Sequence, residues 1–336
     1  MFLRGHIQSF FQMRFYNMNE MKVSIIIPNY NGAQLLKDNF LHVVKALRYW
    51  QQKEKLNGEI VVVDDASNDN SLAVLHALSE SITKHSIPIT IIDKKINDGF
   101  AASVNKGVSQ AVGELIVLLN TDVKPDVDFL LPLLEHFENK DIFSVGCMEK
   151  SIENGETILR GRGIGTWRKG LLVHSAGSTE KKTTLWTSGG SSAFRKSIWD
   201  TVGAMNTMYR PFYWEDIDLS YRAVKSGFII RFEPKSIITH YHSKGSIRKM
   251  HSATYIKTIA YRNQFLFAWA NMTDFDLIIK HVYWLPYHLI SAMVRRDLML
   301  LQGFYLALLH VTDVLRTRNR NKKIFVKSDK AVIESI

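Results

Sequence analysis

Acidic side chains follow two of the apolar runs in this sequence, and their placement is the first indication of chemistry. Asp64 and Asp65 come directly after Glu59–Val63, and Asp122 stands two residues beyond Glu114–Leu119. Two adjacent carboxylates repel each other unless hydrogen-bond donors, such as a nucleobase imide or ribose hydroxyls, lie nearby. A carboxylate just past a buried strand can hold a divalent cation through a hard oxygen ligand. The pattern therefore suggests nucleotide and metal binding.

Both positions also have a structural explanation. Asn70 or Ser71 can cap the helix after the acidic pair, although a cap does not explain the pair itself. Asp122 can cap a helix near Phe129. At these positions the sequence is compatible with both a helix cap and a ligand-binding role.

A third acidic cluster, Glu215-Asp216-Ile217-Asp218, begins a predicted helix. The helix dipole favours acids in a first turn, which explains Asp218 and allows the same explanation for Glu215. It is not a sufficient account of Asp216.

The elements that must position these acids are strands alternating with helices. Between the first two runs, Leu36, Phe40, Leu47 and Trp50 recur at helical spacing, as the leucines do after the second run. Alternation of this kind builds parallel sheets, and strands that are apolar at nearly every position need helices on both faces. We predict a mostly parallel, doubly wound, Rossmann-like α/β sheet with ligands beyond its carboxyl ends. The runs are Val23–Ile27, Glu59–Val63, Ile89–Ile92 and Glu114–Leu119.

Two further segments stand where such a sheet would meet a ligand. Pro28–Gly32 is a turn-rich end to the first strand. Asn97–Gly107 opens a helix with small residues, which lets a ligand approach the backbone and the helix N-terminus. Each is a common type of turn when taken alone.

Beyond Cys147 the pattern changes. A stretch rich in Gly, Ser and Thr continues to about residue 192, and a helix is predicted over Asp216–Ser226, followed by strands at Phe228–Phe232 and Ile237–His240. We interpret this part as a second half attached to the first.

Taken in order, the four tip segments resemble the nucleotide-sugar-binding half of the family 2 glycosyltransferases, which have the A-type glycosyltransferase fold. Val23–Gly32 resembles the opening strand and its Pro-x-Tyr-Asn end, Asp64–Ser71 the acidic base-binding tip, and Asn97–Asn105 the Asn-x-Gly-Phe segment. The donor-binding residues that this resemblance implies are Pro28, Tyr30, Asp64, Asp65, Asn97, Gly99, Phe100, Asn120 and Thr121.

The family's metal-binding Asp-x-Asp is here Asn120-Thr121-Asp122, so the resemblance leaves the metal on Asp122. Asn in the first position of this motif is frequent in one branch of the family, and in this respect the sequence resembles the rhamnosyltransferases and related enzymes of that branch. His240 matches the family histidine that reaches the metal or the diphosphate, with His242 in reserve. The implied cofactor is Mg²⁺ or Mn²⁺.

The resemblance continues to about Ser246. Ser188–Lys196 is similar to the acceptor-side strand, which implies acceptor-side roles for Gly189 and Gly190, and for Trp214 and Glu215 in the Glu-Asp motif. The matching Asp216 is implied to be the general base. Aromatic residues 212–214 would raise its pKa and offer a stacking face for a sugar.

The end of the chain carries most of the charge. From Arg248 onward there are 14 Lys or Arg and 6 Asp or Glu residues, a net +8 of the whole chain's +11. Two uncharged stretches, His281–Val294 and Leu298–Thr312, are shorter than the ~20 residues of a spanning helix. They would lie flat on an anionic bilayer, or else form a helical hairpin packed on the domain.

We therefore expect an extension over residues 1–21, a glycosyltransferase domain over 22–250 with halves 22–147 and 148–250, and a basic amphipathic helical tail over 251–336. A single cysteine, Cys147, favours a reducing compartment, and residues 1–20 lack the pattern of a signal peptide. The expected location is cytoplasmic, with peripheral attachment at the inner face of the membrane as the alternative.

The predicted activity is inverting transfer of a sugar from a nucleotide sugar to a hydroxyl of a saccharide or lipid-linked saccharide, in surface polysaccharide or glycolipid assembly, with no nucleic-acid partner. Two other functions fit the sequence less well. A nucleotidyltransferase would need a basic phosphate loop, whereas Pro28–Gly32 holds no Arg or Lys. A non-catalytic basic scaffold for membrane or nucleic acid would leave the acids unexplained.

Overall fold

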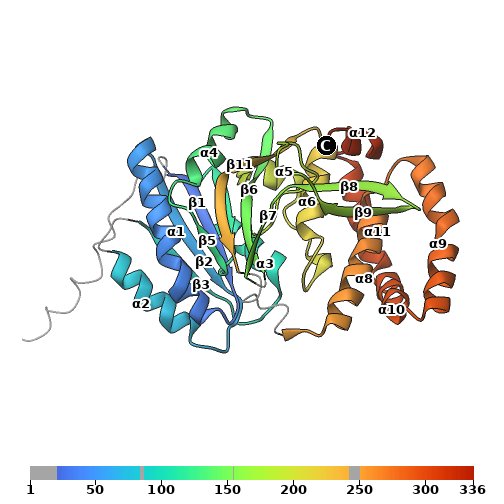
Figure 1. Ribbon diagram of the computed structural model, residues 1–336, viewed down its shortest axis with the longest axis horizontal. Coiled ribbons are helices and arrows are strands. Elements are labelled where there is room, and N and C mark those ends of the chain that lie inside the picture. Colours follow the sequence, from blue (N-terminus) through green and yellow to red (C-terminus); the bar gives the residue numbers. More distant parts are fainter. Residues whose placement is uncertain (1–20, 84–86, 154, 242–249) are drawn as a thin grey trace, which may run out of the picture.

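The computed structural model describes residues 21–83, 87–153, 155–241 and 250–336, and a nine-stranded sheet lies at the centre of this part of the chain (Figure 1). The predicted extension, apart from its last residue, lies outside the described residues. The strand order is β3-β2-β1-β4-β10-β6-β11-β5, with β7 paired to β6. The strands are β1 Met21–Asn29, β2 Asn57–Asp64, β3 Ile89–Asp93, β4 Leu115–Leu119, β5 Val123–Pro125, β6 Ile142–Glu153, β7 Glu156–Arg160, β10 Ser191–Arg195 and β11 Ile229–His240.

The first half of the sheet is parallel, as predicted. β1 pairs in parallel with β2 and β4, and β2 pairs in parallel with β3. β10 then lies between β4 and β6 and runs antiparallel to both, whereas β11 is parallel to β6. The mostly parallel, doubly wound sheet is confirmed, with one antiparallel strand inserted at its centre.

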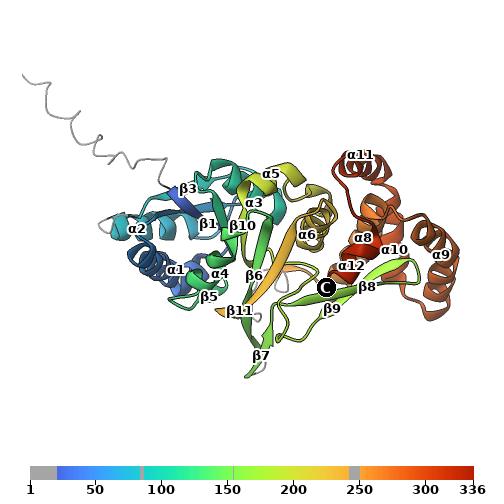
Figure 2. The same cartoon turned by 90° about the horizontal axis from the view of Figure 1, so that it is seen from above.

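Helices cover both faces of the sheet (Figure 2). Along β1, Ile25 and Ile27 pack into one hydrophobic cluster with helices α1, α2 and α4, whereas Ile26 packs into a second cluster with α3, α5 and α6. Burial on both faces explains why the sequence of β1 does not alternate. These helices are α1 Ala33–Glu54, α2 Ser71–Thr83, α3 Phe100–Gln110, α4 Leu130–Glu135, α5 Lys196–Val202 and α6 Glu215–Lys225.

The second half contains more strand than the sequence indicated. β6 continues to Glu153, across the predicted division at residue 147, and the Gly-, Ser- and Thr-rich stretch contains a separate hairpin of β8 Gly163–Arg168 and β9 Leu171–Ala176. The two predicted strands between residues 228 and 240 are one strand, β11, whose pairing with β6 shifts register between Glu233 and Ile237. A bulge interrupts the apolar pattern without ending the strand.

The C-terminal helices are built onto this core. They are α8 Ala253–Asn271, α9 Phe275–Arg295, α10 Leu298–Leu308, α11 Val311–Lys322 and α12 Asp329–Glu334. Phe265, Phe267, Val314 and Val332 belong to the same hydrophobic cluster as α3 and α6. Of the two predicted arrangements, packing on the domain therefore accounts for the inner faces of these helices.

None of the helices in the described ranges is by itself long and apolar enough to span a membrane. The pair formed by α10 and α11 has the length and composition of a span, but bends by 68° at its break.

A buried ion pair joins α12 to α6. Lys225 and Asp329 are fully buried and form a salt bridge, and the Tyr221 hydroxyl also donates to Asp329. The backbone N–H groups of Thr273 and Asp274 donate to the other Asp329 oxygen. Burial lowers the pKa of Lys225, although the Asp329 carboxylate opposes this shift. This network ties the C-terminal helices to the sheet domain.

Replacing Asp329 with Ala should lower the free energy of unfolding by about 3–5 kcal/mol, because it leaves the Lys225 ammonium buried without its counter-charge. Urea unfolding monitored by circular dichroism measures the change. Asp313→Ala, which removes an exposed acid from α11, is the control and should change stability by less than about 0.5 kcal/mol. Equal small effects of both substitutions would contradict the role given to this pair.

Candidate active site

The predicted site segments meet along one edge of the sheet. Asp64 accepts hydrogen bonds from Asn29 and Ser67, Asp65 accepts from Gly99, and the backbone N–H of Asn120 donates to the carbonyl of Gly190. The Gly189 N–H in turn donates to Asp216, at 3.4 Å. Each tip thus contacts the next, as expected where parallel strands end together.

Asp64 lies at the bottom of the first tip and is fully buried. Its Oδ2 accepts from Asn29 Nδ2 at 2.7 Å and from the Ser67 hydroxyl at 2.7 Å, and its Oδ1 accepts from the Ser67 N–H at 2.9 Å. Pro28 and Tyr30, half-buried, flank Asn29. The carboxylate therefore shapes the turn after β2 and ties it to the end of β1.

Asp65 points the other way, toward the N-terminus of α3. Lys94 Nζ donates to its Oδ1 at 2.6 Å, and the Asp98 and Gly99 N–H groups donate at 3.2 and 2.9 Å. The adjacent acids were predicted to need hydrogen-bond donors, and the protein itself supplies them to both Asp64 and Asp65. The two carboxylates also point in different directions, which reduces their mutual repulsion. A bound base or ribose is not required to explain the pair.

The two remaining predicted residues of the α3 segment lie at its opening. Asn97 is exposed and Phe100 is half-buried beside Gly189, where an added Cβ would lie 3.1 Å from the Phe100 ring. Gly99 has a φ of 91°, which only glycine adopts readily. This conformation turns the backbone into α3, and the N–H groups of Asp98 and Gly99 both donate to Asp65.

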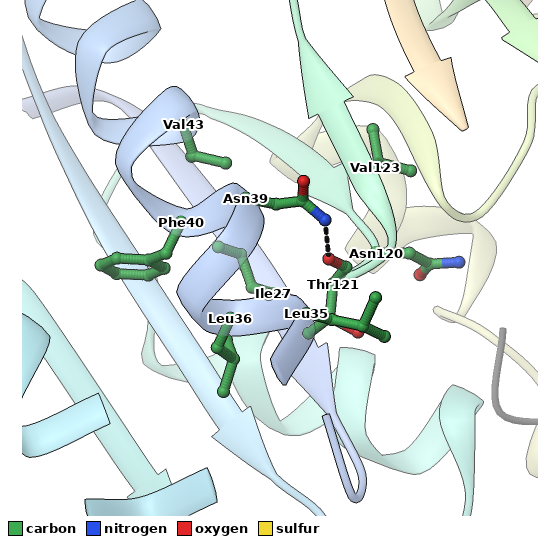
Figure 3. Close-up of a pocket in the computed structure, with 9 residues that line it drawn as sticks. All are labelled: Ile27, Leu35, Leu36, Asn39, Phe40, Val43, Asn120, Thr121 and Val123. Carbon is green, nitrogen blue, oxygen red and sulfur yellow. Dashed lines mark hydrogen bonds between the residues drawn. The ribbon is translucent and has the colours of Figure 1, made fainter. Parts of the chain in front are cut away.

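The turn after β4 is fixed from behind by α1. Asn39 Nδ2 donates to the carbonyl of Thr121 at 2.8 Å, beside a small apolar hollow lined by Ile27, Leu36 and Val123 (Figure 3). In Figure 3 the side-chain amide of Asn39 points at the Thr121 carbonyl, and a dashed line marks their hydrogen bond. The hollow is on the supporting side of the turn, so we do not assign the donor to it.

His240, at the end of β11, lies between two carboxylates. Its Nε2 is 3.2 Å from Asp122 Oδ2, and its Nδ1 is 3.2 Å from Glu149 Oε1. The family resemblance implied that Asp122 and His240 act at the same metal, and the structure brings the two side chains together. His242 lies outside the described residues.

Glu149 was not predicted. It belongs to β6 just beyond the division that was placed at Cys147, and its backbone pairs with Ile238, two residues before His240. Only the register of β6 against β11 shows this neighbour, and no motif in the sequence marks it.

The two carboxylates change the titration of this histidine. Burial alone would lower the pKa of His240, but its hydrogen bonds with Asp122 and Glu149 outweigh burial and raise the pKa to about 10. The described side chains contain no group of three or more His, Cys, Asp or Glu that could hold a metal. Asp122 and His240 together offer one carboxylate and one imidazole.

Asp216 occupies the first turn of α6 and is partly buried. Its Oδ1 accepts from the N–H of Ile217 at 2.8 Å and its Oδ2 from that of Gly189. Burial raises the pKa of Asp216, and these backbone hydrogen bonds oppose the rise. A carboxylate with a raised pKa that still reaches solvent is suited to take a proton.

Glu215 is buried beside Asp216, and its Oε2 has no hydrogen-bond partner among the described residues. Burial and the Asp216 carboxylate raise the pKa of Glu215 to about 8. Near neutral pH this side chain is therefore a protonated acid that can donate a hydrogen bond. Its neighbour Asp218 is structural: it is fully buried and paired with Arg222 at 2.7 Å.

Of the three aromatic residues expected to offer a stacking face, Phe212 and Trp214 are buried. Trp214 packs edge-on against His174 and tilted against Phe267, so its assignment as a direct sugar contact is corrected to a core position. Tyr213 is 39% exposed and can offer its ring. Tyr213 and Trp214 both have positive φ, a strained conformation that positions α6.

Asn263 on α8 holds this strained loop in place. Its Nδ2 lies 2.8–3.0 Å from the carbonyls of Tyr209, Phe212 and Tyr213, and Arg262 donates to the carbonyl of Arg210. The C-terminal helices are therefore part of the support of Asp216.

Comparison with known proteins agrees with this arrangement. Residues 24–203 match the sequence pattern of glycosyl transferase family 2. The chain belongs to this family. A dolichol-phosphate mannosyltransferase of Pyrococcus furiosus is 31% identical over 126 residues, which are 38% of this chain and 33% of that protein. A poly-beta-1,6-N-acetyl-D-glucosamine synthase of Staphylococcus aureus is 25% identical over 224 residues, 65% of this chain and 50% of that protein.

The chain thus spans between a third and a half of the length of these curated family 2 relatives. Solved structures share its fold. GalNAc-T7 with UDP, GalNAc and Mn²⁺ has a TM-score of 0.68 at 18% identity, covering 96% of this chain and 57% of that one. The mannosyltransferase PcManGT of Pyrobaculum calidifontis, with GDP-Man and Mn²⁺, has a TM-score of 0.55 at 16% identity. The match covers 94% of this chain and 85% of that one. The predicted A-type glycosyltransferase fold is confirmed.

The unusual state of Glu215 predicts how the stability of this family 2 chain depends on pH. Because its folded pKa of about 8 lies above its ordinary value of 4.5, the stability gained from the protonated form is lost as pH rises through this window, by up to about 1.4 kcal/mol per pH unit. Glu215→Gln should flatten the fall in unfolding free energy between pH 5 and 8, measured by urea titration. The exposed Glu156→Gln is the control; an unchanged slope in Glu215→Gln would refute the prediction.

Proposed function

We propose that this family 2 chain transfers a sugar from a nucleotide-sugar donor to an acceptor hydroxyl with inversion at the anomeric carbon, in the assembly of a surface polysaccharide or glycolipid. The observation that carries the proposal is the position of Asp216. Its carboxylate is partly buried at the start of α6, has a raised pKa, and reaches the Gly189 N–H in the turn that also contacts Asn120.

In this reaction Asp216 takes the proton from the acceptor hydroxyl as the oxygen attacks the anomeric carbon. The bond from that carbon to the diphosphate oxygen breaks, and the nucleoside diphosphate leaves with the electron pair. General-base catalysis of this kind needs a carboxylate within hydrogen-bond reach of the hydroxyl. The Gly189 N–H and the N-terminus of α6 keep the carboxylate oriented.

The acceptor would lie over Gly189, Gly190 and Glu215. At Gly190 an added Cβ would lie 2.5 Å from Asn120 Nδ2, so a side chain there would displace the tip of β4. Glu215 is buried beneath this face, where it supports Asp216, and the exposed Tyr213 can stack on a sugar ring. A saccharide or a lipid-linked saccharide fits these contacts.

The donor would lie along the tips of β1, β2 and β4. The solved structures named above contain UDP or GDP-Man, and another, TarS residues 1–349 of S. aureus, contains UDP-GlcNAc at a TM-score of 0.55 and 16% identity. These contents support a nucleotide sugar as donor. The predicted donor-binding residues line or shape these tips, and the sugar that we propose is a hexosyl or a deoxyhexosyl group, the latter because Asn120-Thr121-Asp122 resembles the rhamnosyltransferase branch.

Asp122 would hold a divalent cation, Mg²⁺ or Mn²⁺, and His240 would join it once the cation displaces the proton that Asp122 and Glu149 hold on the imidazole. Mg²⁺ is usually held by one or two carboxylates together with substrate phosphates, and an imidazole suits Mn²⁺ less than oxygen but binds it. The two side chains face each other at 3.2 Å, at the ends of β4 and β11. A cation bound there would offset the charge that develops on the departing diphosphate.

Asp216→Asn should lower the rate of transfer by roughly 10²–10⁴, the usual contribution of a general base, and leave donor binding within a few-fold of wild type. Release of nucleoside diphosphate from candidate nucleotide sugars, with saccharide acceptors present, measures turnover. The exposed Asp200→Asn is the matched control and should retain full activity. Near-normal turnover of Asp216→Asn would remove this residue from the role.

Asp122→Ala should abolish transfer and also the tightening of UDP or GDP binding that Mn²⁺ produces, as measured by calorimetry with Mn²⁺ and with EDTA. His240→Ala should cause a smaller loss, because Asp122 still supplies the carboxylate and water can take the place of the imidazole. The control is Asp126→Ala, a half-exposed acid four residues further on. Full activity of the EDTA-treated protein would contradict the assignment of a metal.

A further inference from the structure

The outer face of α9 is apolar and uncovered. Six apolar or aromatic residues on this face are each between 52% and 78% exposed, and apart from the adjacent Val282 and Tyr283 they recur at steps of three, four or seven: Phe275, Ile279, Val282, Tyr283, Ile290 and Val294. We call these six residues the α9 outer stripe. Figure 1 shows α9 at the end of the molecule away from α1 and α2, with no described element beyond it.

The inner face of α9 is already in use. Leu277 packs into the core, and His281 accepts a hydrogen bond from Trp269 and contacts the carbonyl of Gly170 at 2.7 Å. An added Cβ at Gly170 would lie 2.4 Å from His281 Cα, so the hairpin of β8 and β9 touches α9 closely. One apolar face of α9 is therefore packed on the protein and the other is exposed. An exposed apolar face of this size is typical of a surface that binds a membrane or another protein.

Basic and aromatic groups border the α9 outer stripe. Arg295 and Arg296 are exposed at its C-terminal end and Lys280 beside it. Asp276 is the one acid in the sequence of α9, and it is paired with Lys280 and Lys330. Lys169, at the tip of the hairpin, lies 4.3 Å from the centre of the Tyr287 ring. Tyr and Trp beside cations are typical of the zone where a bilayer meets water.

We propose that the α9 outer stripe docks on the surface of an anionic phospholipid bilayer, with the axis of α9 in the plane of the membrane. The inner face stays on the protein, so the helix cannot be surrounded by lipid and lies at the interface. The unbalanced bases favour anionic headgroups. They disfavour a second copy of this chain as the occupant, because α9 of that copy would bring the same bases and one acid, Asp276, which is already paired with Lys280 and Lys330.

Docking of α9 would also orient the candidate active site. The hairpin that touches α9 continues along β9 to His174, whose ring packs edge-on against Trp214, next to Glu215 and Asp216. A lipid-linked acceptor would then be presented at the same surface. This consequence rests on the proposed function, whereas docking itself does not.

Flotation of the purified full chain with vesicles tests the proposal without any nucleotide sugar, so the result is independent of catalytic activity. The probes are vesicles of phosphatidylcholine alone and with 30% phosphatidylglycerol as a rough physiological level of anionic lipid. We expect binding to the anionic vesicles that weakens with added salt and keeps an apolar part. Arg295→Gln with Arg296→Gln should weaken low-salt binding by about 30-fold, since each base near the surface contributes about 1 kcal/mol.

The stripe itself is tested by replacing Ile279, Val282, Ile290 and Val294 with Gln, which should reduce binding more than about tenfold. The matched control replaces four exposed apolar residues elsewhere, Leu41, Leu56, Val127 and Leu159, with Gln and should bind as wild type. Wild-type binding by the stripe variant, or no binding of the wild type to anionic vesicles, would overturn the proposal. A wild-type dimer that the stripe variant turns into a monomer, with vesicle binding unchanged, would assign the stripe to a subunit interface instead.

A single-site probe covers the case in which the fourfold variant fails to fold. Cys147 is buried, and burial raises its pKa to about 12, so it does not compete for a thiol-reactive dye. An environment-sensitive dye on Val282→Cys should shift to the blue when anionic vesicles are added, whereas the same dye on Leu41→Cys should not. Identical spectra at the two sites with vesicles would count against docking through α9.

Discussion

The insertion of β10 in the opposite direction to its neighbours is the constraint on which the candidate active site depends. Because β10 runs antiparallel to β4, its beginning, not its end, lies at the carboxyl edge of the sheet. The Ser188–Gly190 turn therefore meets the tip of β4, where Gly190 accepts from Asn120, and also meets α6, where Gly189 donates to Asp216. A parallel strand in this position would carry that turn to the far edge, and the donor and acceptor sides would not share a boundary.

Support for Asp216 comes from distant parts of the chain. α6 is held at its start by Asn263, which binds the strained loop before it, and near its end by the pair of Lys225 and Asp329. Buried polar groups of this kind are costly unless they are fully paired, so they specify one arrangement of the helices. The C-terminal helices consequently form one folding unit with the sheet in this structure, although their charge and composition differ from those of the rest.

The first half of the fold could be predicted because each of its elements carries its own signal. β1 and β2 are continuous apolar runs, and α1 buries the face that its spacing indicated, from Leu36 to Trp50. The pairing of Asp122 with His240 followed from motifs alone. Glu149 could not be found in this way, because its place depends on the register of β6 against β11. The burial of Trp214 depends on Phe267 and His174, which no local pattern connects to it.

Asn263 contacts the loop before α6 only through backbone carbonyls, those of Tyr209, Phe212 and Tyr213. Such a clamp does not depend on the side chains of the residues that it holds. The exposed ring of Tyr213 can therefore be exchanged during evolution, within the limits of its positive φ, while the loop keeps its course. The part of the loop that positions α6 is thereby separate from the part that faces solvent, so the exposed surface can change without moving the helix.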